Sequence, residues 1–265
     1  MDHIDVPAEQ VVPMETIVEG VQGLRITFVN VFSIRHASGG WTLVDAGVPM
    51  SESAIRSWAK REFHEGPRAI VLTHGHFDHV SAARGLAEEW NVPIYAHELE
   101  FPYLTGQKEY PAPNSGAGGG LMSLLSPIYP RKPLDLGDRL RPLTELEGWE
   151  IVHTPGHTPG HVSLFRPSDR TLLAGDAFCT TKPESFFEAA VAPQPELHGP
   201  PSYFTSDWEA ARRSLQRLAE LHPSVVAPGH GKPLSGPAVA PGLAQLALHF
   251  NEIAVPENRK VGAVS

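Results

Sequence analysis

The sequence predicts an α/β fold, and two observations carry that prediction. Apolar strands alternate with helices over residues 41–97. Strands are predicted at 41–47, within 68–80 (a strand that runs into a polar cluster) and at 92–97, and helices at 51–63 and 81–90. This rhythm of strand and helix indicates parallel strand pairing. In addition, four apolar strands of the whole chain deliver polar residues at their C-terminal ends, and that edge is where ligands bind in open α/β sheets.

The first half of the chain opens with a predicted strand at residues 24–35, which are rich in β-branched and aromatic residues in partial alternation. Residues 41–47 predict a short buried strand that ends at Asp45 before a glycine turn. Residues 51–63 have the apolar spacing of a helix, with Ser51 as its N-cap. The next strand runs directly into the polar cluster of residues 74–79, which we expect in a turn where its side chains can converge.

The second half repeats the pattern of a strand followed by a polar turn. Residues 149–165 predict strand, polar turn and strand, and residues 171–178 predict an apolar strand that ends in glycine and an acid. Residues 206–221 predict an amphipathic helix with Ser206 or Asp207 as the N-cap. A strand and a histidine-bearing turn follow at 224–231, and a closing helix begins near residue 240.

Two stretches break the regular pattern, at residues 98–137 and 178–208. Long irregular segments in compact domains are often functional loops, so we expect lid-like insertions that form walls of a substrate pocket. The candidate wall residues are aromatic or apolar: Tyr103, Met122, Phe178, Phe186 and Tyr203. The alternative is that these side chains cap the hydrophobic core.

Length and composition predict one globular domain over residues 1–265. The chain has 265 residues, 41% of them apolar, which is enough to bury a sizeable core. Its formal net charge of −9 disfavours nucleic acid as a partner. No membrane partner is expected, because no apolar stretch approaches the roughly 20 residues that span a bilayer. Cys179 is the single cysteine and the first residues do not resemble a signal peptide, so we expect a cytoplasmic protein.

The cluster THGHFDHV is the strongest chemical signal. It places three histidines and one aspartate within six residues after a buried strand. Neutral imidazole and carboxylate are good zinc ligands, and such groups packed together are costly unless a cation is present. The sequence therefore predicts a metal site.

HGHFDH resembles the HxHxDH signature of the metallo-β-lactamase superfamily, and TPGHTPGH, GDAF and PGHG follow in the order typical of that family. The resemblance covers roughly residues 15–235. It implies a four-layer αββα sandwich with two mixed sheets face to face. It also implies a dinuclear metal site with seven ligands: His74, His76 and His157 for one ion, Asp78, His79 and His230 for the other, and Asp176 as a bridge.

The resemblance assigns supporting roles as well. Asp45 and His161 would lie next to the ligands without binding metal, because metal-bound histidines usually donate their other ring nitrogen to such a group. Asp78 and Asp176 would act in catalysis together with a metal-bridging hydroxide. Two zinc ions, about 3.5–4 Å apart, can share one hydroxide that attacks the substrate near neutral pH. Iron or manganese could replace zinc at such ligands.

The predicted function is hydrolysis of a small ester, lactone or thioester, as in the seven-ligand glyoxalase II and lactonase types. Glutathione thioesters are less expected, because only 35 residues follow His230 where glyoxalase II has a helical region. Three alternatives stay open: an iron-dependent dioxygenase of the persulfide type, a phosphodiesterase or nuclease of the same superfamily, and a non-catalytic binding module. The oligomeric state is also open, with a homodimer as one option.

Overall fold

The computed structural model describes residues 6–14, 16–112, 135–181 and 196–256. The chain forms two compact units. Unit 1 comprises Met1–Glu109 and Pro130–Gly148, and unit 2 comprises Tyr110–Tyr129 and Trp149–Ser265. That residues 1–265 behave as a single domain stays a prediction.

Unit 1 is built on a seven-stranded sheet in the order β1-β2-β3-β4-β5-β6-β7. Its strands are β1 (Val11–Pro13), β2 (Val21–Ile26), β3 (Val29–Arg35), β4 (Trp41–Val44), β5 (Ala69–Val71), β6 (Ile94–Ala96) and β7 (Leu140–Pro142). The first four strands pair antiparallel, whereas β4 to β7 pair parallel. The sheet is therefore mixed, and its parallel half lies where the alternation of strand and helix predicted parallel pairing.

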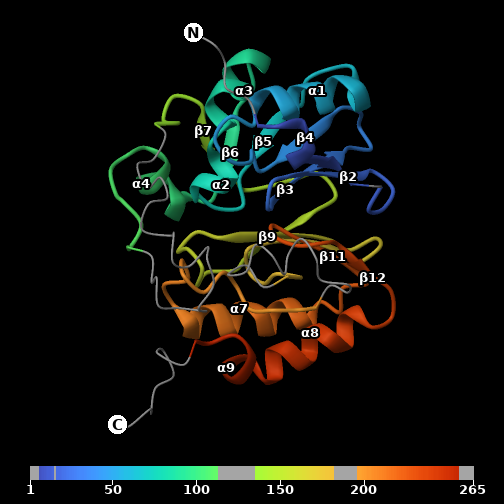
Figure 1. Ribbon diagram of the computed structural model, residues 1–265, viewed down its shortest axis with the longest axis vertical. Helices are drawn as coiled ribbons and strands as arrows, with labels where there is room; N and C mark the ends of the chain where they lie inside the picture. The colour runs from blue at the N-terminus through green and yellow to red at the C-terminus, as the bar shows by residue number, and fades with distance from the viewer. Residues whose placement is uncertain (1–5, 15, 113–134, 182–195, 257–265) are drawn as a thin grey trace. The chain divides into compact units, whose positions relative to one another are not determined.

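The helices of unit 1 are short except for two that cover one face of the sheet (Figure 1). The set comprises η1 (Ala8–Gln10), α1 (Glu52–Phe63), α2 (Phe77–Val80), α3 (Ala83–Trp90), η2 (Glu98–Glu100) and α4 (Phe101–Leu104). On α1 and α3 the buried side chains, such as Ile55 and Leu86, join Leu43 and Ile70 of the sheet in one apolar core. Burial of these apolar faces stabilises the unit.

Two local predictions for unit 1 are wrong. Residues 24–35 are not one strand, because Thr27 takes a left-handed φ of 57° and turns the chain between β2 and β3. Ser51 is the N-cap residue of α1 as predicted, although its side chain makes no capping hydrogen bond. Regular structure also continues past residue 97, since η2 and α4 follow β6 directly.

The metal motif also differs in part from the predicted turn. His74, Gly75 and His76 lie in a connection between β5 and α2, but Asp78 and His79 belong to α2 itself. The helix is a single turn and begins immediately after His76. A short helix that starts inside the motif can still present neighbouring ligands on one side.

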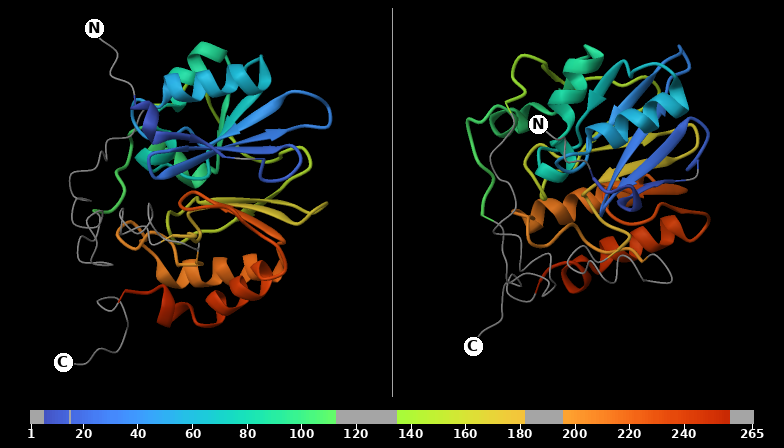
Figure 2. Two further views of the ribbon diagram at one scale, coloured as in Figure 1. Left: turned by 45° about the vertical axis from the view of Figure 1, so that its right-hand side comes forward. Right: turned by 45° about the horizontal axis from the view of Figure 1, so that its top comes forward.

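Unit 2 is built on a five-stranded sheet in the order β12-β11-β10-β9-β8. Its elements are β8 (Glu150–His153), β9 (Val162–Arg166), β10 (Thr171–Gly175), α7 (Trp208–Glu220), β11 (Val225–Pro228), β12 (Leu234–Ser235), α8 (Val239–Leu248) and α9 (Phe250–Ile253). Only β10 and β11 pair parallel, so this sheet is mixed as well. Figure 2 shows α7 and α8 side by side along one face of it.

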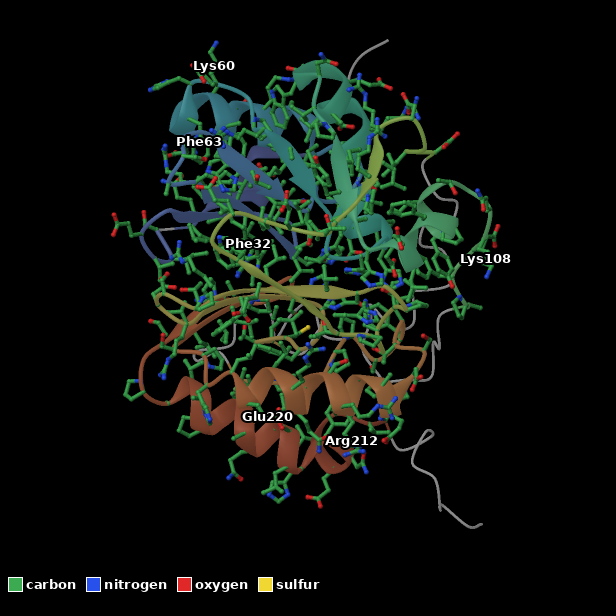
Figure 3. All side chains as sticks on the ribbon, turned by 180° about the vertical axis from the view of Figure 1, so that it is seen from behind. Phe32, Lys60, Phe63, Lys108, Arg212 and Glu220 are labelled. Atoms are coloured by element: carbon green, nitrogen blue, oxygen red, sulfur yellow. The ribbon has the colours of Figure 1, made fainter. Side chains whose placement is uncertain are left out.

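Helix α7 illustrates how the sequence pattern sets the packing of unit 2. The Asp207 side chain accepts the hydrogen bond of the Ala210 backbone N–H, which identifies Asp207 as the N-cap. Leu215 and Leu218 are fully buried in the core of the unit. Arg212 and Glu220, labelled in Figure 3, belong to the polar side of the same helix. The predicted amphipathic helix is therefore confirmed.

Both sheets are mixed, and each carries helices on one face, as the predicted fold class requires. Among the helices that the structure describes, none is both long and apolar enough to cross a bilayer.

Candidate metal centre

In unit 1, three adjacent parallel strands end at the same edge of the sheet and deliver polar residues there. Strand β4 is followed by Asp45, β5 by the segment Thr73–His79, and β6 by His97 and the helix η2. Parallel neighbours bring their C-terminal ends together, which is why residues far apart in sequence meet at this edge.

His74 and His76 are arranged as two ligands of one ion. The Nε2 atom of His74 lies 3.1 Å from Nδ1 of His76, and both side chains are buried. Two nitrogens bound tetrahedrally to one zinc at about 2.0–2.1 Å lie roughly 3.3 Å apart. The spacing of this pair therefore fits a shared ion.

Asp45 holds the ligand turn of unit 1 in place. Its Oδ1 accepts the backbone N–H of Thr73, and its Oδ2 accepts the Thr73 hydroxyl and the Nδ1–H of His79, each at 2.8 Å. The Thr73 hydroxyl oxygen lies 3.0 Å from Nδ1 of His74. These bonds engage the Nδ1 atoms of His74 and His79 and direct their Nε2 atoms away from Asp45, as in metal sites whose histidines are fixed by outer partners.

Asp78 lies on the same helix turn as His79. The carboxylate Oδ2 of Asp78 is 3.9 Å from Nε2 of His79, and Asp78 is only 5% exposed. Unit 1 thus presents four buried donors in six consecutive residues.

In unit 2, the parallel pair β10 and β11 ends in Asp176 and His230, while the turn between β8 and β9 carries His157. The Oδ2 atom of Asp176 lies 3.1 Å from Nε2 of His230 and 3.4 Å from Nε2 of His157. One carboxylate oxygen of Asp176 therefore lies within 3.4 Å of both imidazole nitrogens.

His157 is fixed from behind by Thr205. The Thr205 hydroxyl donates to the carbonyl of Pro201 at 2.7 Å, which leaves its oxygen to accept the Nδ1–H of His157 at 3.2 Å. Gly156 precedes this ligand with a φ of 137°, and a Cβ there would overlap the backbone nitrogen of Ala211 on α7. Glycine at 156 allows the ligand turn to rest directly on the start of α7.

His161 and His153 have other partners in this turn. His161 Nε2 accepts the backbone N–H of Asp176 at 2.8 Å, and its Nδ1 lies 2.8 Å from the Thr154 hydroxyl. Both ring nitrogens of His161 are thus engaged by protein groups, which suits a residue that positions Asp176. His153 Nε2 bonds to the carbonyl of Pro159 and closes the turn.

The charge balance of the buried groups fits a cation. Within the described ranges, the buried residues include four carboxylates but no lysine or arginine. The carboxylates are Asp45, Asp78 and Glu100 in unit 1 and Asp176 in unit 2. Burying a charge is costly without a compensating partner, so buried carboxylates beside buried histidines suit divalent metal ions.

The predicted pocket residues have different fates. Met122 and Phe186 lie outside the described residues. Phe178 has no exposed surface and belongs to the apolar core of unit 2, so we leave it out of the proposed pocket. Tyr103 is half-buried on α4 of unit 1, and Tyr203 is buried beside Phe204 in unit 2.

A cavity of about 630 Å³ in unit 1 contains none of the predicted ligands. It is lined by residues that include His36, Thr42, Arg68, Tyr95 and Glu147. Burial, the largest effect, lowers the pKa of His36, while the Ser38 hydroxyl lowers that of Glu147. Thr42 and Arg68 lie at or just before the starts of β4 and β5, opposite the strand ends that carry the ligands.

Sequence reasoning did not identify Thr73, Glu100 and Thr205. Thr73 directly precedes HGHFDH, and its position beside the motif was an available signal. Thr205 and Glu100 carry no local signal, because each reaches the ligands through the fold of its unit.

Comparison with known proteins identifies the class. Residues 24–230 match the family profile described as the metallo-beta-lactamase superfamily. The chain is 42% identical over 245 residues to the probable metallo-hydrolase YflN of Bacillus subtilis strain 168, covering 89% of this chain and 92% of that protein. Fold and site together define a metal-dependent hydrolase.

Solved structures agree on the fold. TTHA1623, described in a di-iron-bound form, is 27% identical with a TM-score of 0.53, covering 85% of this chain and 93% of that chain. The archaeal superfamily protein ST1585 from Sulfolobus tokodaii has a TM-score of 0.57 at 22% identity, covering 84% and 80%. The chain belongs to the metallo-β-lactamase superfamily and has its fold, with two mixed sheets and flanking helices.

Proposed function

We propose that this protein is a dinuclear metal hydrolase that cleaves a small ester, lactone or thioester. One ion would be held by His74, His76 and His157, the other by Asp78, His79 and His230, with Asp176 shared between them. One observation carries the proposal: all seven side chains are buried, although histidine and aspartate ordinarily prefer water.

Two bound ions would lower the pKa of a shared water and polarise the carbonyl of the substrate. The protein's own residues supply the preorganisation. Asp45 and Thr73 fix the ring nitrogens of His74 and His79, and Thr205 does the same for His157. Bonding of the Nδ1–H to an acceptor selects the tautomer whose Nε2 has a free electron pair for metal.

The proposed substrate class rests on charge and on the ligand set. The acidic net charge of −9 disfavours polyanions such as nucleic acid. The seven-ligand set is similar to that of glyoxalase II and lactonase types, which favours a carbonyl substrate. Tyr103, Tyr203, Met122 and Phe186 remain the candidate residues of the pocket wall, with residues 98–137 and 178–208 as its segments.

Zinc is the proposed metal, because imidazole and carboxylate suit it without a thiolate. The same donors bind iron, and the relative TTHA1623 is described in a di-iron form. An iron-dependent dioxygenase is therefore the second candidate. We place the protein in the cytoplasm, where its single cysteine, Cys179, would stay reduced.

One experiment tests the proposal. Protein purified without added metal is assayed for zinc, iron and manganese, then tested on lactones, thioesters, simple esters, β-lactams and phosphodiesters. We expect two zinc ions per chain and hydrolysis of a lactone, ester or thioester that a chelator abolishes and zinc restores. Iron alone with no hydrolysis would contradict the proposal, and so would cleavage confined to phosphodiesters.

A further inference from the structure

Glu100 is a buried carboxylate in unit 1 that lies close to the ligand turn. It is the last residue of η2, which follows β6, and it has 0% exposed surface. Strand β6 pairs in parallel with β5, and the Leu72 N–H continues that pairing by donating to the carbonyl of Tyr95. The chain after β6 is therefore held beside the chain after β5, which carries the ligand turn.

The contact of Glu100 is with the ligand turn itself. Its Oε2 accepts the backbone N–H of Gly75 at 2.9 Å. Gly75 separates His74 and His76, whose ring nitrogens lie 3.1 Å apart. Because this hydrogen bond holds the Gly75 amide between the two histidines, it restricts the backbone dihedral angles of the turn. Glycine has more backbone freedom than any other residue, so the restriction is largest there.

The three parallel strands thus contribute one buried carboxylate each to this edge of unit 1. Asp45 follows β4, Asp78 follows β5 and Glu100 follows β6. A carboxylate that is entirely buried is stable when a cation lies near it. Asp45 bonds the ligands from one side, and Glu100 bonds the backbone between two of them.

We propose that Glu100 is a positioning residue of the metal centre, which fixes the His74–Gly75–His76 turn and adds an outer negative charge that strengthens metal binding. The inference rests on the proposed function, since it assigns the ions to these ligands. In this proposal Glu100 acts through the backbone N–H of Gly75 and not as a metal ligand.

Two variants separate the two contributions. Glu100→Gln keeps an oxygen that can accept the Gly75 N–H but removes the charge, whereas Glu100→Ala removes both. Glu98→Gln is the matched control, because Glu98 lies on the same short helix, is exposed, and loses the same charge. The zinc dissociation constant is measured by competition with a chromophoric chelator, and thermal unfolding is followed with and without zinc.

We expect Glu100→Gln to raise the zinc dissociation constant about 10–100-fold, the usual effect of losing an outer partner of a metal site. Glu100→Ala should raise it at least as much and also lower the melting temperature of the metal-free protein. Glu98→Gln should change the constant by less than about twofold, because solvent screens an exposed charge. Excess zinc should restore the kcat of Glu100→Gln.

The outcomes distinguish this inference from the proposed function. If both Glu100 variants bind zinc as Glu98→Gln does, the positioning role is wrong, even where the melting temperature falls. If the wild-type protein binds two ions but hydrolyses nothing in the panel, the substrate class is wrong and the role of Glu100 stands. A wild-type protein that binds no metal overturns both.

Discussion

Unit 1 and unit 2 differ in how their proposed metal ligands are arranged and supported. The four ligands of unit 1 lie within residues 74–79, and Asp45 engages two of them, one directly and one through Thr73. The three ligands of unit 2 come from three separate connections, and His157 has its own partner in Thr205. In unit 1 one residue, Asp45, therefore positions two of the proposed ligands, whereas in unit 2 His157 is positioned by a residue of its own, Thr205.

This difference predicts how the loss of a supporting residue in each unit affects metal binding. Damage to the shared support of unit 1 should affect both ions together, since His74 and His79 are assigned to different ions. Damage to one support in unit 2 should affect one ion. Asp176 is the exception in unit 2, because its carboxylate lies between His157 and His230.

The largest effect is expected for Asp176→Ala. This change removes the carboxylate between two imidazoles, so neither ion should be retained and hydrolysis should fall by more than the roughly 100-fold that marks loss of an outer partner. Metal content after dialysis and kcat/KM measure it. His157→Ala is the comparison and should lose one ion. An Asp176→Ala protein with two tightly bound ions would show that Asp176 is no bridge.

The next effect is that of Asp45→Ala. The change leaves the buried Thr73 N–H without its acceptor, which should lower the free energy of unfolding by about 1–3 kcal/mol. Both ions should bind about 10–100-fold more weakly, because His74 and His79 lose their common support. Chelator competition and chemical denaturation measure the two effects. Weakening of a single ion would refute the idea of shared support in unit 1.

Thr205→Val tests the separate support of His157 in unit 2. Valine has a similar shape but cannot accept the Nδ1–H, so one ion should bind about tenfold more weakly while the other is unchanged. Thr205→Ser keeps the hydroxyl and should restore binding. Stepwise zinc titration separates the two ions. Equal weakening of both would mean that the supports of unit 2 are coupled.

Gly156→Ala should have the smallest effect on metal binding and act on stability instead. Its Cβ would overlap the backbone of Ala211, and its φ of 137° is unfavourable for alanine, so unfolding should require about 1–3 kcal/mol less. Gly236→Ala is the control, with a φ of 108° but no atom within 4 Å of the added carbon. If denaturation midpoints of the two variants agree, the close approach to α7 is not important for stability.

The sequence predicted the elements whose pattern of apolar and polar residues lies within one continuous segment. The amphipathic helix α7 and the short strands that end just before Asp45 and Asp176 lie where apolar spacing predicted them. The hairpin of β2 and β3 was missed because strand-forming residues continue through its turn, which contains no glycine or proline. Thr27 makes that turn with a positive φ, which composition does not signal.

The same distinction applies to the candidate site: its contiguous motif could be predicted from the sequence, and the residues brought to it by the fold could not. The ligand motif of unit 1 is contiguous, so sequence spacing was enough to predict that its side chains lie together. Glu100 and Thr205 contact the ligand turns only because β6 pairs with β5 and because residues 201–207 lie against the 156 turn. Strand pairing and tertiary packing of this kind leave no signal in a single sequence.

The close contact between Gly156 and α7 also limits which residues can be substituted on either side of it. Ala211 sits in the first turn of α7, and the carbonyl of Gly156 accepts the backbone N–H groups of Ser206 and Asp207 just before it. The turn that carries His157 therefore packs directly against the first turn of α7. Ala211 is buried, and its backbone nitrogen, Cα and Cβ are the atoms that a Cβ added at position 156 would meet. A change at position 156 therefore has to be designed together with the first turn of α7.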